Sequence, residues 1–179
     1  MNADCQASKN DLEFAVEKSI RYHGRMAARY ETISKLLMFM VILSGSASFA
    51  AFMDKSQFFG AGAAVIAAFA LVYSPGNRAA RHRNLRNRFS DLAIEIQKSE
   101  DSPENLNQWK SKRLHIEQDE PPIFWALEAD CCNEVCRARG QDEYIENLRW
   151  WPRLTMYSLR HSRSAARIFT DRKAASGLA

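Results

Sequence analysis

Three of the four cysteines in this 179-residue chain lie close together, at Cys131, Cys132 and Cys136. Cys132 and Cys136 are one helical turn apart, which is the spacing of a zinc ligand pair. A zinc site needs a second pair, and the nearest candidates, His115 and His161, are isolated in the sequence. We therefore expect small buried cysteines in a reducing compartment and no metal site.

Motifs for acid–base or phosphate chemistry are also missing from the sequence. Asp119 and Glu120 are adjacent carboxylates, but Pro121 and Pro122 follow them directly, which is typical of a helix boundary. The sequence contains no glycine-rich phosphate loop, no His-Glu-x-x-His motif and no nucleophile elbow. We expect no enzymatic activity, no catalytic residue and no cofactor.

Two long stretches without charged residues interrupt the chain segments that would have to position any catalytic or metal site. Charged residues make up 26% of the chain, yet none occurs in residues 36–53 or 56–77. Both stretches approach the roughly 20 residues that a bilayer requires, so they predict transmembrane helices at about 36–53 and 58–73. The short connection between them predicts an antiparallel hairpin, and a buried hairpin in a globular core is the alternative interpretation.

Basic residues flank this hairpin on both outer sides. Lys35 precedes the first stretch, and Arg78, Arg81 and Arg83 follow the second. Because basic residues concentrate on the cytoplasmic side of membranes, we expect both termini in the cytoplasm. Ser74, Pro75 and Gly76 predict a break in the helical rod just after the second span.

Small side chains share one face of each predicted span. Small residues let helix backbones approach closely in lipid, within a hairpin or between subunits, and this face is also a candidate pore lining. Neither span contains an ionisable residue, which argues against a pump, a transporter or a selective channel and leaves a non-selective pore or a plain anchor. The face consists of Ser44, Ala47, Ser48 and Ala51 in the first span and Gly60, Ala64, Ala67 and Ala68 in the second.

Apolar residues recur at helical spacing on both sides of the hairpin, so the expected fold class is all-α with a cytoplasmic helical bundle. We expect four regions: an N-terminal amphipathic helix at 1–35, the transmembrane hairpin at 36–76, the bundle at 77–150 and a basic tail at 151–179. Within the bundle, Ser102 followed by Pro103 predicts a helix start. A further helix is expected from about 123 to 139, ended by Gly140.

Charge is segregated along the predicted bundle and tail. Residues 91–146 hold 14 acidic and six basic side chains, a net charge of −8, whereas residues 149–179 hold seven basic and one acidic, a net charge of +6. The basic tail is expected to bind anionic lipid headgroups, or to lie across the acidic helices of its own or a neighbouring subunit. No nucleic-acid partner is expected, because the tail lacks interleaved aromatic residues.

Several short motifs resemble those of the SLATT family, the "SMODS and SLOG-associating two-transmembrane effectors". Arg21-Tyr22-His23 precedes the first span, and Arg81-His82-Arg83-Asn84-Leu85 follows the second. The candidate family motif consists of Asp119, Glu120, Pro121, Pro122, Asn133 and Glu134. The resemblance covers roughly residues 12–150.

This resemblance implies a membrane effector of a bacterial anti-phage, abortive-infection system, located in the inner membrane with two spans. Such effectors are thought to form homo-oligomeric, non-selective pores when a sensor or a nucleotide-second-messenger protein detects infection. The expected partners are thus the lipid bilayer, further copies of the chain and such a sensor. A non-conducting anchor or scaffold that recruits a cytoplasmic partner is the alternative, and a holin is a further rival.

Overall fold

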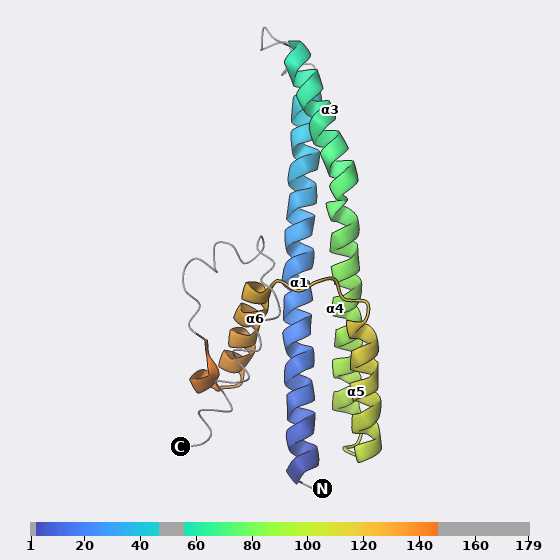
Figure 1. The fold of residues 1–179 in the computed structure, drawn as a ribbon, viewed down its shortest axis with the longest axis vertical. Coiled ribbons are helices and arrows are strands. Elements are labelled where there is room, and N and C mark those ends of the chain that lie inside the picture. The colour runs from blue at the N-terminus through green and yellow to red at the C-terminus, as the bar shows by residue number, and fades with distance from the viewer. Residues whose placement is uncertain (1–2, 47–55, 147–179) are drawn as a thin grey trace. The chain divides into compact units, whose positions relative to one another are not determined.

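The computed structural model describes residues 3–46 and 56–146, and every element in that part of the chain is helical (Figure 1). The chain forms two compact units, one from Met1–Tyr22 and Asn87–Ala179 and the other from His23–Arg86. The predicted helical class is therefore confirmed for the described residues. The elements are α1 (Ala3–Gly45), α3 (Ser56–Tyr73), α4 (Pro75–Lys98), α5 (Pro103–Glu117), α6 (Trp125–Ala138) and the 3-10 helix η1 (Asp142–Tyr144).

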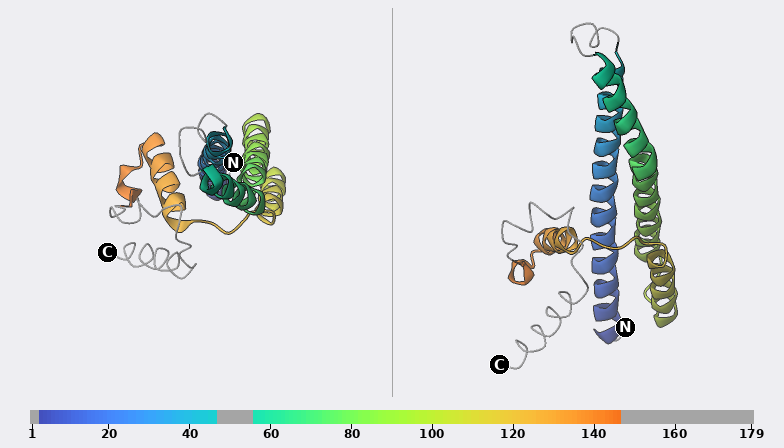
Figure 2. Two further views of the ribbon diagram at one scale, coloured as in Figure 1. Left: turned by 90° about the horizontal axis from the view of Figure 1, so that it is seen from above. Right: turned by 45° about the horizontal axis from the view of Figure 1, so that its top comes forward.

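The first unit is built from the beginning of α1, the end of α4, and the shorter helices α5 and α6. An ion pair joins α5 to α4, with Lys112 Nζ 2.5 Å from Glu95 Oε1, and the two helices run side by side (Figure 1). Helix α6 lies against α1 (Figure 2), with Lys18 Nζ 2.6 Å from Glu128 Oε1. The principal buried apolar side chains of this unit are Leu12, Val16, Phe89, Leu92, Ile96, Leu106, Trp109, Ile116, Leu127, Cys131 and Val135.

Helix α5 begins where the sequence predicts. Ser102 has extended backbone angles and its hydroxyl accepts a hydrogen bond from the Asn105 amide at 3.1 Å, which satisfies one of the unpaired amides at a helix start. Pro103 occupies the first turn, where its missing N–H costs nothing. Leu106, Trp109 and Ile116 of this helix are buried, whereas Leu114 is 60% exposed.

Helix α6 ends at the glycine that the sequence singles out. Gly140 has a φ of +66°, a left-handed conformation that favours glycine. The Gln141 amide donates to the Cys136 carbonyl at 2.9 Å and the Gly140 amide donates to the Arg137 carbonyl at 3.1 Å. This is the Schellman pattern, which satisfies carbonyl groups that a helix end leaves unpaired.

The second unit contains the rest of α1, all of α3 and the beginning of α4. Among the described residues, its buried side chains are contributed by α1 and α4. They are His23, Met26, Ala27, Tyr30, Pro75, Ala79, His82 and Leu85.

The predicted break after the second apolar stretch is confirmed. Helix α3 ends at Tyr73 and α4 begins at Pro75, with Ser74 between them at a φ of +43°. The Ser74 hydroxyl donates to the Leu71 carbonyl at 2.5 Å, which compensates in part for the interrupted helical ladder.

The predicted two-helix transmembrane hairpin, and with it the location in an inner membrane with two spans, is wrong. Among the residues that the structure describes, no helix combines the length and the apolar character needed to cross a membrane. Helix α1 ends at Gly45, so it includes only the first ten residues of the 36–53 stretch, or about 15 Å. Helix α3 opens with Ser56 and Gln57 and is rich in alanine and glycine, which carry little apolar surface.

Candidate functional site

Two buried histidines from different helices meet in the second unit. His23 on α1 and His82 on α4 are 1% and 4% exposed, and their Nδ1 atoms are 3.0 Å apart, a hydrogen-bond distance. A neutral imidazole has one donor and one acceptor nitrogen, so this contact needs one Nδ1 to carry a proton and the other to lack one. The pair therefore shares a single proton between two helices.

Further rings extend the contact into a series that we call the aromatic ladder, made of His23, His82, Tyr30, Tyr73 and Phe69. Tyr30 of α1 stacks on His82, with centroids 5.6 Å apart and planes at 17°. Tyr30 also meets Tyr73 of α3 at 6.4 Å. Tyr73 in turn stacks on Phe69 at 5.4 Å. The aromatic ladder thus links all three helices of this unit.

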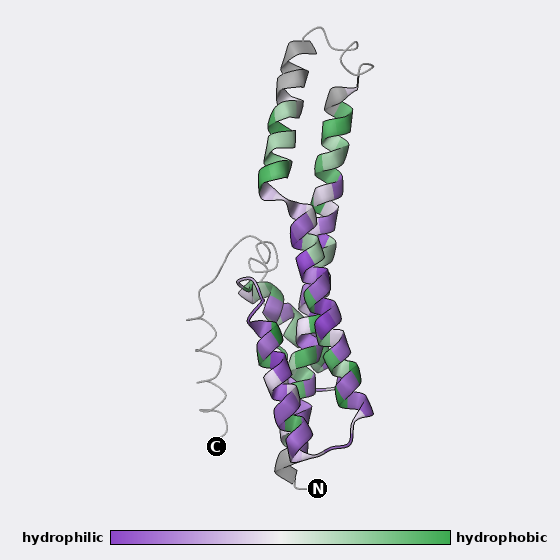
Figure 3. Cartoon of the chain, turned by 90° about the vertical axis from the view of Figure 1, so that its right-hand side faces the viewer, coloured by the Kyte–Doolittle hydropathy of each residue, from purple (hydrophilic) through white to green (hydrophobic). Residues whose placement is uncertain are grey.

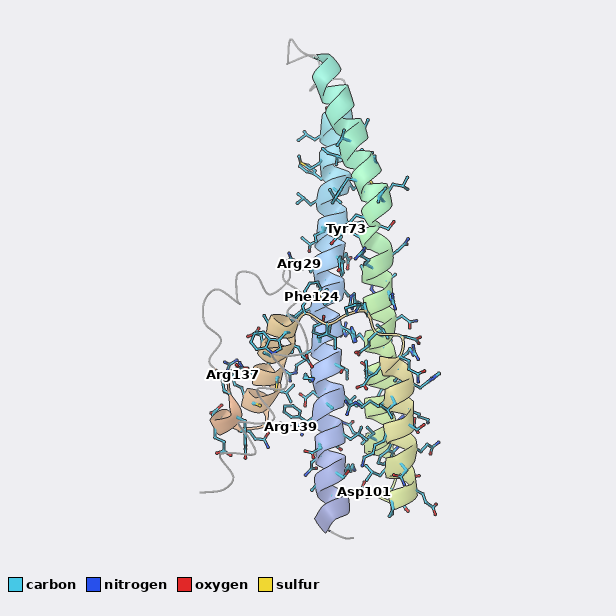
Figure 4. The ribbon with its side chains drawn as sticks, in the orientation of Figure 1. Arg29, Tyr73, Asp101, Phe124, Arg137 and Arg139 are labelled. Atoms are coloured by element: carbon cyan, nitrogen blue, oxygen red, sulfur yellow. The ribbon has the colours of Figure 1, made fainter. Side chains whose placement is uncertain are left out.

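Arg78 anchors the ladder at the junction between α3 and α4. Its guanidinium lies 4.7 Å from the centroid of the Tyr73 ring, a cation–π distance, and 6.0 Å from that of Tyr30. Its Nε also donates to the Tyr73 carbonyl at 3.1 Å. Because this carbonyl immediately precedes Ser74, Arg78 holds the interrupted backbone and the rings together. Figure 4 labels Tyr73 near this junction.

The electrostatics of the ladder disfavour positive charge on His82. Burial, then the neighbouring charge of His23 and then that of Arg81, lower the pKa of His82 to about 4. Glu31 is the single acidic residue among the described residues of this unit. Lys35 and Arg83 engage it and lower its pKa. The His82 ring is therefore neutral at neutral pH.

A second cluster of polar contacts holds α6 on α1 in the first unit. The Phe124 amide, at the start of α6, donates to the Tyr22 hydroxyl at 3.0 Å, so a tyrosine serves the role that a capping residue usually serves. At the other end of α6, Arg139 donates from Nε to the Glu17 carboxylate at 3.2 Å (Figure 4).

Both residues of the Asn-Glu element lie in this cluster. Asn133, a polar residue of the candidate family motif, is only 3% exposed. Its side chain donates to the Glu146 carbonyl at 2.7 Å and accepts from the Glu146 amide at 2.8 Å. Asn133 therefore fixes the segment after η1, and burial raises the pKa of the Glu146 carboxyl. The Oε2 atom of Glu134 lies 3.9 Å from Nη1 of Arg21, a long ion-pair distance.

The Asp-Glu-Pro-Pro element lies between α5 and α6. Asp119 pairs with Arg88 of α4 at 2.5 Å. The Glu120 amide donates to the Glu117 carbonyl at 3.1 Å, which closes the last turn of α5. Pro121 and Pro122 precede α6 by a few residues and do not form its first turn. In this chain the motif makes helix-ending and helix-joining contacts.

The predicted small-residue face is only partly within the described residues. Ala64, Ala67 and Ala68 are exposed on α3. Ser44 lies near the end of α1 and Gly60 near the start of α3. Ala47, Ser48 and Ala51 lie outside the described residues, as does the basic tail at 151–179.

The clustered cysteines make no metal site with their described neighbours. Cys131 and Cys136 are buried and Cys132 is half-buried, all as thiols. Burial, and next the nearby Cys136, raise the pKa of Cys132, which disfavours the reactive thiolate. Within residues 3–46 and 56–146, no group of three His, Cys, Asp or Glu side chains is placed to hold a metal ion.

Comparison of the chain with protein-family models, with curated proteins and with solved structures gives no match.

The sequence carries a signal for the burial of both histidines, although they belong to no motif. His23 continues the apolar stripe of α1, seven residues after Val16 and seven before Tyr30. His82 lies three residues before Leu85 and seven before Phe89, on the stripe of α4. A histidine on each of two apolar stripes predicts burial, but only the helix pairing brings the two rings together.

Proposed function

We propose that this chain is a non-enzymatic effector that acts by assembling with further copies of itself. The class is the one that the SLATT resemblance implies, an abortive-infection effector whose oligomer forms a non-selective pore after a sensor or a nucleotide-second-messenger protein signals. The proposal concerns the assembled oligomer and does not reinstate the two-span arrangement of the single chain.

The observation that carries the proposal is an apolar surface in the second unit, which we call the apolar tip. Figure 3 shows hydrophobic residues along the described ends of α1 and α3. Within the apolar tip, Val72 is 85% exposed and Phe39 is 59% exposed. Monomeric proteins rarely leave large apolar patches exposed to solvent. The apolar tip comprises Leu36, Met38, Phe39, Met40, Ile42, Leu43, Val65, Phe69, Leu71 and Val72.

A second copy of the chain is the occupant that fits the apolar tip best. Covering an uncharged apolar surface stabilises an assembly by about 25 cal/mol per Å² only if the partner surface is also apolar. Elsewhere in the described residues the exposed large apolar side chains are scattered singly, at Ile94, Leu114, Ile123 and Tyr144. The matching surface that this chain offers is therefore the apolar tip of another copy.

The test compares the mass of the full chain in solution with that of a charged variant. We expect wild type to form oligomers, and Phe39→Asp/Val72→Asp to be a monomer, because two buried carboxylates would face each other across the assembly. Leu114→Asp, which places the same charge on an exposed leucine of α5, is the matched control and should stay oligomeric. A monomeric wild type would overturn the proposed self-assembly.

Two additional measurements distinguish self-assembly from lipid binding, and the pore from the scaffold function. Vesicles of anionic and of neutral lipid are sedimented with each variant, and a monomer that binds vesicles through Phe39 and Val72 would identify lipid as the occupant instead. Dye entry is measured in cells that express the chain together with its trigger. Intact membranes alongside intracellular oligomers would reject the pore and leave the scaffold function.

The scaffold function is the second candidate, and one observation favours it. The first unit exposes several carboxylates, among them Asp91, Glu104, Asp142 and Glu143. An acidic surface attracts a basic partner through long-range charge. Salt-sensitive binding of a basic protein that persists in Phe39→Asp/Val72→Asp would support the scaffold.

A further inference from the structure

The His23–His82 contact is the feature of the second unit that neither proposed function uses. It is a hydrogen bond between two ionisable rings that are nearly inaccessible to water. Such a contact depends on protonation more strongly than any ion pair at the surface, because its geometry allows one proton and excludes two.

We infer that the His23–His82 contact is an acid-opened latch, which holds α1 to α4 within the second unit at neutral pH and releases them when both rings carry a charge. With one proton between the two Nδ1 atoms, one ring donates and the other accepts. When both rings are imidazolium, two N–H donors face each other at 3.0 Å, so the contact must break.

The charged groups around the latch favour this response. On α4, Arg81 adds positive charge next to His82. On α1, the face of the Tyr30 ring offers a weak cation–π attraction, and Arg78 already lies 6.0 Å from that ring. On α3, Tyr73 meets Tyr30 and contributes no charge. Glu31, the described acid of the unit, is engaged by Lys35 and Arg83 and is not placed to neutralise the histidines.

Two energetic effects of opposite sign therefore compete at His82. Stacking on Tyr30 favours the cation, whereas burial and the charges of His23 and Arg81 oppose it. The opposing effects, burial first and the charges of His23 and Arg81 next, lower the pKa of His82 from 6.5 to about 4. Protonation of His82 beside a charged His23 is therefore the event that opens the latch.

Opening would spread along the aromatic ladder. Tyr30 stacks on His82 and also touches Tyr73, so loss of the histidine contact frees a ring that braces α3. Tyr73 is the last residue of α3 before the left-handed Ser74. The interrupted backbone there lacks the full helical ladder, so it is the place where α3 and α4 can change their angle at the lowest cost.

Hydrogen exchange on the full chain tests the latch. After correction for the intrinsic effect of pH, amide exchange in residues 23–30 and 79–86 should rise about tenfold per pH unit as the pH falls from 6.5 toward 4. His82→Asn removes the titration but keeps a polar atom near the Nδ1 position, so its exchange in these segments should not respond. His115→Asn, at an exposed histidine of α5, should respond like wild type.

Every other result of the exchange experiment either supports or overturns the latch. Flat wild-type exchange from pH 7 to 4, or an acid response retained in His82→Asn, overturns the latch. If His82→Asn does not fold, nitrogen-15 signals of the imidazole rings in wild type replace it. A shared Nδ1 proton with His82 titrating near pH 4 supports the latch, and titration of His82 at its ordinary value overturns it.

Discussion

The first unit joins its helices largely with charged side chains, whereas the second joins them largely with rings, in addition to the ion pair between Arg83 and Glu31. In the first, Lys18 pairs with Glu128 and Arg139 pairs with Glu17, so α6 is linked to α1 by opposite charges. In the second, the aromatic ladder connects α1, α3 and α4. The first unit buries most of its large apolar side chains, while the second leaves the apolar tip exposed.

This difference indicates that the stability of the two units depends on different interactions. Partly exposed ion pairs contribute little free energy but fix which helix packs where, so the stability of the first unit comes from its buried core. The second unit has uncovered apolar surface and a proton-dependent contact, so its stability depends on its surroundings. Assembly and pH should therefore act mainly on the second unit.

The largest expected effect is on the core of the first unit. Trp109 on α5 is 1% exposed, so Trp109→Ala should lower the free energy of unfolding by about 3–5 kcal/mol through lost burial and a cavity. Hydrogen exchange should locate the loss in residues 87–117 and leave residues 23–46 protected. Leu114→Ala is the control at an exposed position, and equal loss of protection in both units would contradict the comparison.

Acid should lower the free energy of unfolding of the second unit by slightly less than Trp109→Ala lowers that of the first. The folded-state pKa of His82 is lowered to about 4 from 6.5, so the unfolded chain binds more protons in this window. The stability that the neutral ring contributes is complete above pH 6.5 and is lost as the pH falls toward 4. The loss is about 3 kcal/mol, measured as wild type minus His82→Asn in denaturant titrations at each pH. Parallel curves for the two proteins would contradict it.

The next largest loss of stability is expected for a substitution at Asn133, in the first unit. Asn133→Ala leaves the amide and the carbonyl of Glu146 without their side-chain partner, at a cost of about 2 kcal/mol. The unfolding midpoint and the exchange of residues 141–146 measure the effect. Asn107→Ala, at an exposed position of α5, should change neither.

Arg78 should have a smaller effect on the second unit. Arg78→Ala removes the cation above Tyr73 and the hydrogen bond to its carbonyl, together worth about 1 kcal/mol. Arg78→Lys keeps the positive charge and should recover part of this. The exchange rates of residues 70–78 report the change, and identical rates in both variants would mean that charge plays no part.

The smallest effect is expected for a single ion pair of the first unit. A double-mutant cycle of Lys18→Ala and Glu128→Ala should give a coupling free energy of about 0.5 kcal/mol that shrinks as salt is added. A coupling several times larger and independent of salt would show that these pairs stabilise the unit as well as orienting α6.

Much of the helical framework was predictable because its signals are local. The Ser102 cap, the Ser74–Gly76 break and the Gly140 stop depend on backbone chemistry within a few residues, and each is confirmed. The two-span prediction failed because a count of uncharged residues does not reveal where a helix ends, and α1 ends at Gly45. The partners of Asn133 and His82 were not predictable, because they lie 13 and 59 residues away along the chain.

By itself, the sequence determined the helical class, the helix boundaries with strong caps and the segregation of charge, since each follows from residue types close together in the chain. Only the tertiary structure decided that His23 meets His82, that Asn133 is buried and that the apolar tip stays exposed. These outcomes depend on which helix faces pair, and many pairings of the same helices would bury similar apolar area. The proton shared between α1 and α4 is therefore a property of the fold rather than of any sequence motif.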